Sequence, residues 1–304
     1  MKKVMIVFML SLFFATTLSA QKYSISVPRF ARPLVEQWVA DYKKVEPGVQ
    51  FNILQGCGCM SDATLSVLPY AQESASPNNV VYFASYVILP FTQKDSEAQK
   101  LLNSKRLSIK RLRHLFFEHD IYGDDEDETT KFEKQLKRLT VLSANNGAPL
   151  AVPFAQFFQE DVNNIRGRRI SGDDAFLTTA VKKDPKAVSF NALSNLYDLD
   201  SRRLKDGIAL LRLDINKELE NGIEQEATID ELMDLIRQNP AKEIPVGKVG
   251  FVYHGYQADV NRFLLWVLTQ GKDSLTRYGL LDISDDLAEQ QISKVSTQFT
   301  AQNQ

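Results

Sequence analysis

Two glycine-rich turns and one arginine are the features of this 304-residue chain best suited to binding an anion. The turns span residues 56–61 and 145–148, and each is expected to lead into a helix. A helix that starts at such a turn directs unpaired backbone N–H groups and the positive end of its dipole outward. Arg29 would add a charge-assisted contact to a phosphate, sulfate or carboxylate. The candidate ligand-binding residues are Arg29, Phe30, Cys57, Gly58, Cys59, Ser61, Asn145, Asn146, Gly147 and Ala148.

The same residues also have purely structural interpretations. Arg29 would then be a solvated surface charge, and both turns would only connect secondary structure. Cys57 and Cys59 allow a disulfide, thiol redox chemistry, a soft-metal contact, or simple packing. Only one residue separates them, so a disulfide between them would close a strained ring. They are also the only two cysteines, so they do not complete a set of metal ligands. Packing is the interpretation that this spacing favours.

Sequence motifs of common enzymes are absent from the chain. It has no G-x-S-x-G elbow, no H-E-x-x-H pair, no Walker loop and no G-x-G-x-x-G after a strand. Its three histidines are read as structural or surface residues. We therefore expect a protein that is not an enzyme, with no cofactor and no bound metal.

The first 20 residues are typical of a cleaved secretory signal. Lys2 and Lys3 precede an apolar run over residues 4–15, and small residues lead to Gln21. The run is shorter than the roughly 20 residues of a membrane span, and no cysteine lies just after the cleavage point, since the first cysteine is Cys57. The sequence thus predicts a soluble periplasmic protein with no membrane insertion after signal removal.

Composition limits the partners of the mature chain. Without Lys2 and Lys3 the chain has 34 basic residues against 38 acidic ones, which argues against a nucleic-acid binder. A charged fraction of 24% and an apolar fraction of 44% are typical of globular proteins, and the length suggests two domains. We expect a monomer that binds a small molecule.

Strand and helix periodicities alternate along the chain, which predicts an α/β protein. A strand at 23–27, a helix at 34–42, a strand at 49–53 and a helix after Ser61 or Asp62 form a β-α-β-α opening. Two short apolar strands follow at 80–83 and 86–89, the second ended by Pro90. Later helices and strands alternate, with a capping box at Thr228 and Glu231. A last helix begins at Ser284.

This order of turns and helices resembles that of periplasmic phosphate-binding proteins, the receptors of phosphate ABC importers. The segment 29–38 resembles their first ligand loop and helix, and 56–61 lies where they have a Gly/Ser-rich turn. Segments 86–91, 170–174 with 188–191, 263–271 and 278–280 agree with later parts of the family. The resemblance covers nearly the whole mature chain, although each motif is loose.

The resemblance implies a type 2 periplasmic-binding-protein fold, in which two α/β lobes are joined by two crossing strands with a ligand cleft between them. The expected domains are a signal peptide at 1–20, a discontinuous first lobe at 21–90 and 246–296, a second lobe at 91–245, and a flexible tail at 297–304. The crossing strands are expected at 86–91 and 244–251. In this family hinge closure holds the ligand in the cleft.

The family's phosphate ligands are largely replaced in this chain. Its first-loop Thr or Ser corresponds to Arg29, and the Ser of its Gly-rich turn corresponds to Cys57 or Cys59. The second-lobe Arg falls near Ser143 or Ala144, the Ser-Gly-Thr run becomes residues 147–149, and no residue matches the buried Asp. Two hypotheses follow: a periplasmic solute-binding protein that captures phosphate or another oxyanion for an inner-membrane ABC permease, or an envelope binding module acting through protein contacts. A thiol oxidoreductase using both cysteines is a more distant third.

Overall fold

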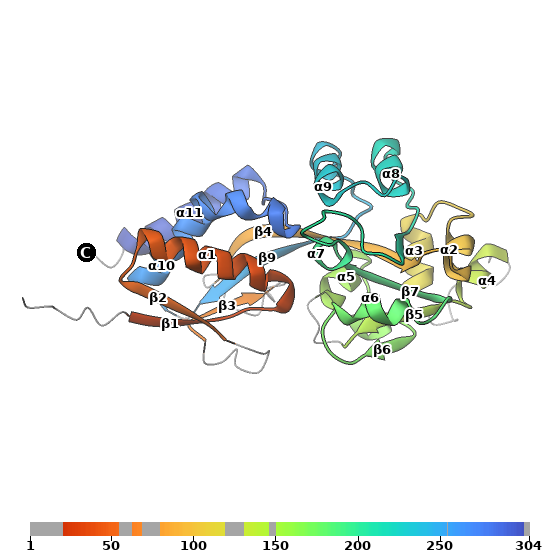
Figure 1. Ribbon diagram of the computed structural model, residues 1–304, viewed down its shortest axis with the longest axis horizontal. Coiled ribbons are helices and arrows are strands. Elements are labelled where there is room, and N and C mark those ends of the chain that lie inside the picture. Colours follow the sequence, from red (N-terminus) through yellow and green to blue (C-terminus); the bar gives the residue numbers. More distant parts are fainter. Residues whose placement is uncertain are drawn as a thin grey trace, which may run out of the picture.

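The computed structural model describes residues 21–54, 63–68, 80–118, 131–145, 150–253 and 255–300. The predicted signal at 1–20, the turn at 56–61 and residues 146–148 lie outside the described residues. Figure 1 shows two lobes side by side, joined through the long strands β4 (Val80–Gln93) and β9 (Val246–Tyr253). The described part of the chain has the predicted α/β architecture.

One sheet runs through both lobes in the order β2-β1-β3-β9-β4-β7-β5-β6, with β8 also paired to β4. β1, β2 and β3 are parallel, whereas β9 is antiparallel to β3 and β4. In the second lobe β5 is parallel to β6 and β7, and β4 is antiparallel to β7 and β8. The remaining strands are β1 (Gln21–Ser26), β2 (Val49–Leu54), β3 (Leu65–Leu68), β5 (Thr140–Ala144), β6 (Arg168–Ile170), β7 (Ala187–Ala192) and β8 (Ile208–Leu210).

Helices cover the sheet in each lobe (Figure 1). The first lobe carries η1 (Arg29–Ala31), α1 (Arg32–Val45), α10 (Ala258–Thr269), η5 (Gly271–Ser274), η6 (Thr276–Tyr278) and α11 (Asp285–Thr300). The second carries α2 (Glu97–Leu102), α3 (Ile109–Phe116), α4 (Lys131–Leu136), α5 (Ala151–Phe157), η4 (Val162–Asn164), α6 (Phe176–Val181), α7 (Leu193–Leu196), α8 (Lys217–Glu224) and α9 (Ile229–Gln238). The predicted capping box is confirmed at the start of α9, where the Thr228 and Glu231 side chains each bond the other's backbone N–H.

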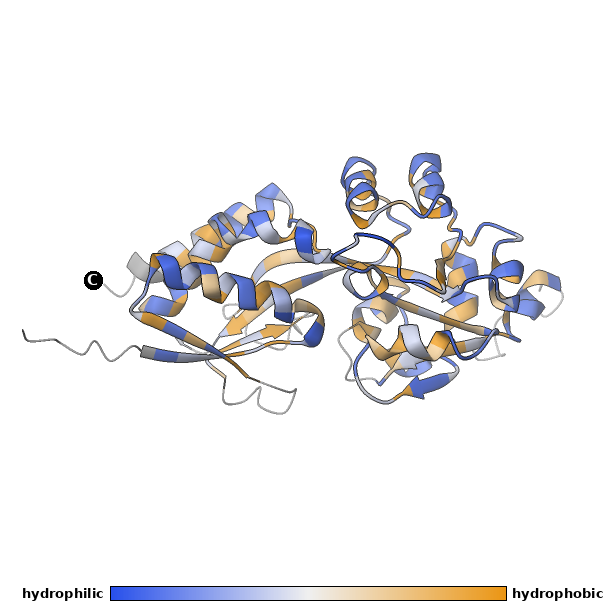
Figure 2. Ribbon diagram, in the orientation of Figure 1, coloured by the Kyte–Doolittle hydropathy of each residue, from blue (hydrophilic) through white to orange (hydrophobic). Residues whose placement is uncertain are grey.

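Each lobe has a core rich in aromatic side chains, and Figure 2 shows apolar residues along the strands of both lobes. In the first lobe Trp38 is fully buried and donates its indole N–H to the Gly271 carbonyl at 2.8 Å, fixing α1 against η5. In the second lobe the rings of Phe154 and Phe190 stack at 3.7 Å, fixing α5 on β7. Each lobe therefore buries apolar surface of its own.

The helix predicted after Ser61 or Asp62 is wrong, because Leu65–Leu68 forms strand β3. Leu65 and Val67 are buried, and β3 lies between β1 and β9 with strands on both sides. A buried central strand reads as a short continuous apolar run, which periodicity alone does not separate from a helix. The opening of the chain is therefore β-α-β-β rather than β-α-β-α.

The two short strands predicted at 80–83 and 86–89 are one continuous strand, β4, with an irregularity between Tyr82 and Ala84. Pro90 does not end it. The Pro90 carbonyl accepts the Leu211 N–H at 3.1 Å, and N–H and C=O of one strand residue point to the same side. The missing N–H of Pro90 therefore faces Leu211, just past the end of β8, so the interruption falls at the end of the β4–β8 ladder.

β4 pairs with β9 from Val80 to Val87 and with β7 from Ile88 to Thr92. The crossing strands predicted at 86–91 and 244–251 thus belong to β4 and β9. α11 continues to Thr300, so the first four residues of the expected tail are helical and the rest lie outside the described residues. Among the described residues, no helix has both the length and the apolar character needed to cross a membrane.

Candidate functional site at the junction of the lobes

Arg29 lies at the start of η1, directly after β1, and its side chain is exposed. Its guanidinium carbon is 5.6 Å from the centre of the Phe176 ring, which belongs to the second lobe. This separation is within the range of a cation–π contact, which attracts a cation to the face of an aromatic ring. The predicted anion-binding arginine therefore faces the opposite lobe.

Phe176 is 47% exposed at the first position of α6, although it is a large apolar side chain. The turn before it contains Gly172 with a φ of 109°, a conformation that favours glycine. A Cβ atom at Gly172 would lie 2.8 Å from the Phe176 ring. Gly172 thus lets the aromatic ring lie against its own turn, where the ring meets Arg29.

Behind this pair, Phe30 packs against the crossing strands. It is 8% exposed, and its ring centre is 5.8 Å from that of Tyr86 in β4. The Tyr86 ring in turn lies across Gly247 of β9, where an added Cβ would fall 2.1 Å from the ring. Phe30 is therefore a packing residue between the first loop and the hinge strands, and its neighbour Arg29 projects from this packed base.

Asp174 is the buried carboxyl group of the junction, at 2% exposure. Its Oδ2 accepts the Leu150 N–H at 3.3 Å, and its backbone carbonyl accepts the Asn191 amide at 2.7 Å. Oδ1 has no hydrogen-bond partner among the described residues. Burial, and then the nearby charge of Asp173, raise the pKa of Asp174 to about 7. The same carboxyl group raises the pKa of Tyr86, whose shift is due first to burial.

The second predicted turn is only partly described. Asn145 is exposed directly after β5, whereas Asn146, Gly147 and Ala148 lie outside the described residues. The turn does lead to a helix, α5, as predicted. The Leu150 N–H at that helix start, however, is occupied by Asp174. An anion approaching this turn would meet a carboxyl group, so binding there favours the neutral form of Asp174.

The structure removes part of the argument for an anion site at the first predicted turn. Cys57, Gly58, Cys59 and Ser61 lie outside the described residues. The segment that follows them is β3 rather than a helix, so no helix over 65–68 can direct a dipole at this turn. The anion site built on two helix starts is therefore reduced, in the described residues, to Arg29, the N-terminal end of α5 and the side chains between them.

A further arginine, missed in the sequence, lies near the end of β5. Arg169 of β6 donates to the buried Ser143 hydroxyl at 2.7 Å and to the Val162 carbonyl at 3.0 Å. The resemblance placed a second-lobe arginine near Ser143 or Ala144, and the arginine beside Ser143 comes from the neighbouring strand β6. Within the described residues no group of three or more His, Cys, Asp or Glu side chains could hold a metal.

Sequence reasoning also missed Asp174, Phe176 and Tyr86. The sequence signal for Asp174 was present: two carboxylates follow Gly172, and the second precedes an apolar run. The pattern did not show that Asp174 is buried while Asp173 is only half-buried. Phe176 carried no signal, since an aromatic residue early in a helix is normally in the core.

Comparison with solved structures places this geometry in a known fold. A protein described as a phosphate ABC transporter substrate-binding protein from Clostridium perfringens, with bound phosphate, superposes with a TM-score of 0.59 at 13% identity, covering 87% of this chain and all of that one. An ABC-type phosphate transport receptor from Vibrio cholerae gives 0.54 at 12% identity, covering 86% and 100%. PstS from Borrelia burgdorferi gives 0.50 at 11%, covering 87% and 99%.

The fold is that of a type 2 periplasmic binding protein. The expected resemblance to phosphate-binding proteins of ABC importers is confirmed at the level of structure. No family model matches the sequence, and no curated protein matches it. At these identities the comparison shows a shared fold.

Proposed function

We propose that this protein is a periplasmic solute-binding protein that captures a small oxyanion, such as phosphate, between its lobes and delivers it to an inner-membrane ABC permease. The binding-protein fold supports a solute-binding role, and its neighbours are described as receptors of phosphate importers. The observation that carries the proposal is Arg29, an exposed cation that projects from one lobe toward the other.

Ligand capture in this proposal uses hinge closure. The first lobe comprises residues 21–90 and 246–296 and the second 91–245, with β4 and β9 as the hinge. Closing brings Arg29 and the first turn, which includes Cys57, Gly58, Cys59 and Ser61, toward Asn145, Asn146, Gly147 and Ala148. A bound anion would then receive the guanidinium and backbone N–H groups together.

Isothermal titration calorimetry with phosphate, sulfate and acetate tests this function. Arg29→Ala should weaken oxyanion binding by about 1.5 to 3 kcal/mol, because one charge-assisted contact is lost. Lys43→Ala is the matched control, since it removes an exposed positive charge from the far turn of α1. Equal losses in both variants would show a general charge effect and contradict a specific site.

The second candidate is an envelope binding module that keeps this fold and acts through protein contacts. Two observations favour it: β3 replaces the helix expected after the first turn, and Asp174 already occupies the Leu150 N–H. Folded, ligand-free protein that gives no heat with any of the three anions would support this candidate over transport.

A further inference from the structure

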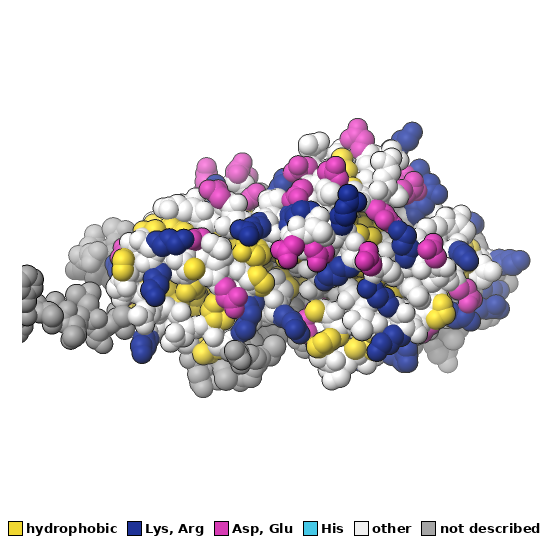
Figure 3. All heavy atoms as spheres, viewed as in Figure 1, with side chains coloured by type: hydrophobic (Ala, Val, Ile, Leu, Met, Phe, Trp, Pro, Cys, Tyr) yellow, Lys and Arg dark blue, Asp and Glu magenta, His cyan; other side chains and the backbone are white. Residues whose placement is uncertain are grey.

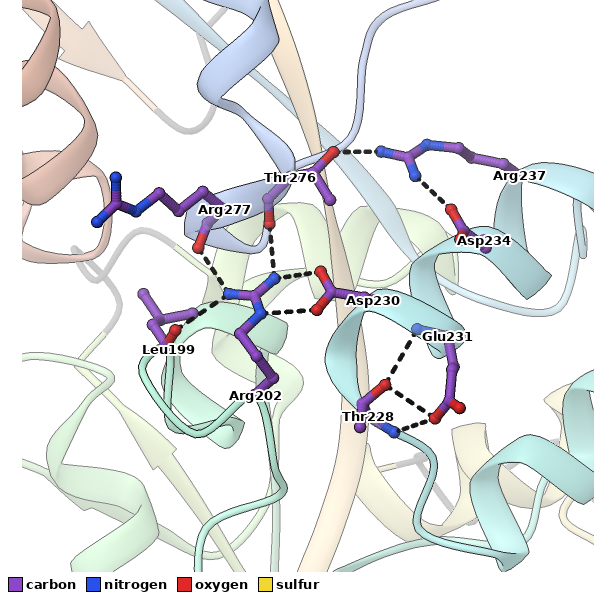
Figure 4. Close-up of polar contacts among 9 residues, drawn as sticks. All are labelled: Leu199, Arg202, Thr228, Asp230, Glu231, Asp234, Arg237, Thr276 and Arg277. Atoms are coloured by element: carbon purple, nitrogen blue, oxygen red, sulfur yellow. Dashed lines mark hydrogen bonds and ion pairs between the residues drawn. The ribbon is translucent and has the colours of Figure 1, made fainter.

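A cluster of polar contacts joins the two lobes on the side of α7, α9 and η6 (Figure 4). Its centre is Arg202, which lies between α7 and β8 in the second lobe. The guanidinium binds both Asp230 oxygens, at 2.8 and 2.5 Å, and the Leu199 carbonyl at 3.2 Å. It also donates to the Thr276 carbonyl at 3.0 Å and the Arg277 carbonyl at 2.7 Å, both in the first lobe. These contacts use all five N–H groups of the side chain.

The backbone and the side chain of Arg202 are both held in place by neighbouring groups. Arg202 has a φ of 63°, which is uncommon for a residue with a side chain and persists where the surroundings determine it. Its own carbonyl accepts the Ile229 N–H at 2.9 Å, which fixes it to the start of α9. The Arg202 side chain is only 21% exposed, and its guanidinium holds the pKa of Asp230 below the usual range. Bidentate, partly buried pairs of this kind are stronger than exposed ion pairs.

A second arginine makes a parallel contact between the lobes. Arg237 of α9 donates to the Thr276 hydroxyl at 2.7 Å and pairs with Asp234 of its own helix. Acidic and basic side chains are interspersed over the region of α8 and α9 on this face (Figure 3). The first-lobe segment η6 is thus bound by α9 from one side and by Arg202 from the other.

The same first-lobe segment runs beside the hinge. Leu281 exchanges two backbone hydrogen bonds of 2.8 Å with Ser85 of β4. Gly279 packs so closely on α7 that a Cβ atom there would lie 3.2 Å from the Ser194 nitrogen. Beside the hinge, the described residues of the two lobes therefore meet through three adjacent connections: β4, β9 and the non-covalent contacts of residues 276–279.

We propose that the Arg202 cluster is the pivot of lobe movement, a contact that stays intact while the lobes rotate and that sets how far they open. A rotation of one lobe against the other, about an axis through these three adjacent connections, would break none of them. Arg29 and Phe176 approach each other across the junction of the same lobes, so this rotation changes their separation. Arg202 is a positioning residue: it acts on the ligand cleft only through the angle between the lobes.

The effect on lobe angle stands without any ligand, whereas its consequence for affinity rests on the proposed function. When the lobes are open more often, a smaller fraction of the protein is competent to bind, and the apparent affinity falls in proportion to the competent fraction. If loss of the cluster shifts the equilibrium about tenfold, a wide-open population of about 1% becomes about 10%.

The test is the distance between one spin label on each lobe, measured by pulsed electron spin resonance on ligand-free protein. Ketone-bearing amino acids at the exposed positions Lys43 in α1 and Lys110 in α3 carry the labels, so the native cysteines stay in place. In Arg202→Ala the distance distribution should broaden and gain a wide-open population of about 10%, against about 1% in the wild type. An unchanged distribution in folded Arg202→Ala would overturn the proposal.

Arg166→Ala is the matched control. Arg166 donates to three backbone carbonyls, of Leu115, Leu136 and Leu139, all within the second lobe. Its loss should lower thermal stability and leave the distance between the lobes unchanged. If Arg202→Ala does not fold, Arg202→Lys keeps the charge without the bidentate geometry and should show the same broadening, and an unchanged distribution there would also overturn the proposal. Absence of anion binding in all variants would contradict the proposed function and leave the distance result standing.

Discussion

Asp174 places a carboxyl group where water is excluded and only one of its oxygens is satisfied by the described residues. Burial disfavours the charged form, and the nearby Asp173 adds to this effect, so the pKa is about 7 in the folded protein against an ordinary 3.8. The folded state therefore binds a proton more tightly than the unfolded state between these two values. Stability from this group is full at low pH and is lost as the pH rises to about 7.

Replacement of Asp174 by Asn should remove this pH dependence. The wild type should lose up to about 4 kcal/mol of unfolding free energy between pH ~4 and pH ~7, and the Asn variant should lose less. Urea unfolding of both proteins across this range measures the difference. A gap between the two proteins that is the same at every pH would contradict the assignment of a raised pKa to Asp174.

At the level of single residues, the sequence predicted that Arg29 is accessible, but it did not predict the buried Asp174 beside the junction. Arg29 was predicted and lies there, because a charged residue in a loop is exposed in almost any fold. Asp174 was not predicted, since its burial depends on α5 and β7, which are distant in sequence. Contacts made by tertiary packing leave no local pattern.

Among the secondary-structure elements, β4 and β9 depend on one close approach. The Tyr86 ring is fully buried against Gly247, its register partner in β9. The sequence predicted a crossing strand at 244–251 but did not single out Gly247 as the point of contact. Glycine inside a strand often marks such an approach, which the sequence alone does not locate.

Gly247→Ala should destabilise the hinge strands. An added Cβ would lie 2.2 Å from the Tyr86 hydroxyl oxygen and 2.1 Å from the ring, and the ring has no free space to move into. We expect a loss of about 2 kcal/mol or more, the range of overpacked cores. Chemical denaturation measures it, with Val246→Ala as the control because Val246 is 51% exposed. Losses of equal size in both variants would show that the close approach is relaxed without cost.

At the scale of the whole molecule, the two-lobed fold was predictable because the order of strands and helices can be recognised even where most individual residues differ from those of the solved structures. The fold matches solved structures at 11–13% identity. The ligand was not predictable, because the sequence keeps few of the residue types that the resemblance implies for a phosphate site. Arg29 stands where the resemblance has a hydroxyl, and a change of that kind alters chemistry without altering topology.

Export is the whole-molecule prediction that is easiest to test. The predicted cleavage before Gln21 would leave β1 as the first element of the mature protein, since β1 begins at Gln21 and pairs with Val49. Mass spectrometry of protein from a periplasmic extract should find an N-terminus at or very near Gln21. Recovery of the chain with Met1 still attached would contradict a cleaved signal.

The shared sheet also sets the order in which the protein can fold as it is synthesised. β3 is paired on one side by β1 and on the other by β9, and the aromatic core around Tyr42 and Phe51 is completed by Phe263 of α10. β9 and α10 follow the second lobe in the sequence, so they leave the ribosome after that lobe has been synthesised. The first lobe therefore keeps an unpaired strand edge and an incomplete core until synthesis is nearly finished. Late completion of this kind delays folding of the first lobe, which would keep that part of the chain unfolded during the export that the sequence predicts.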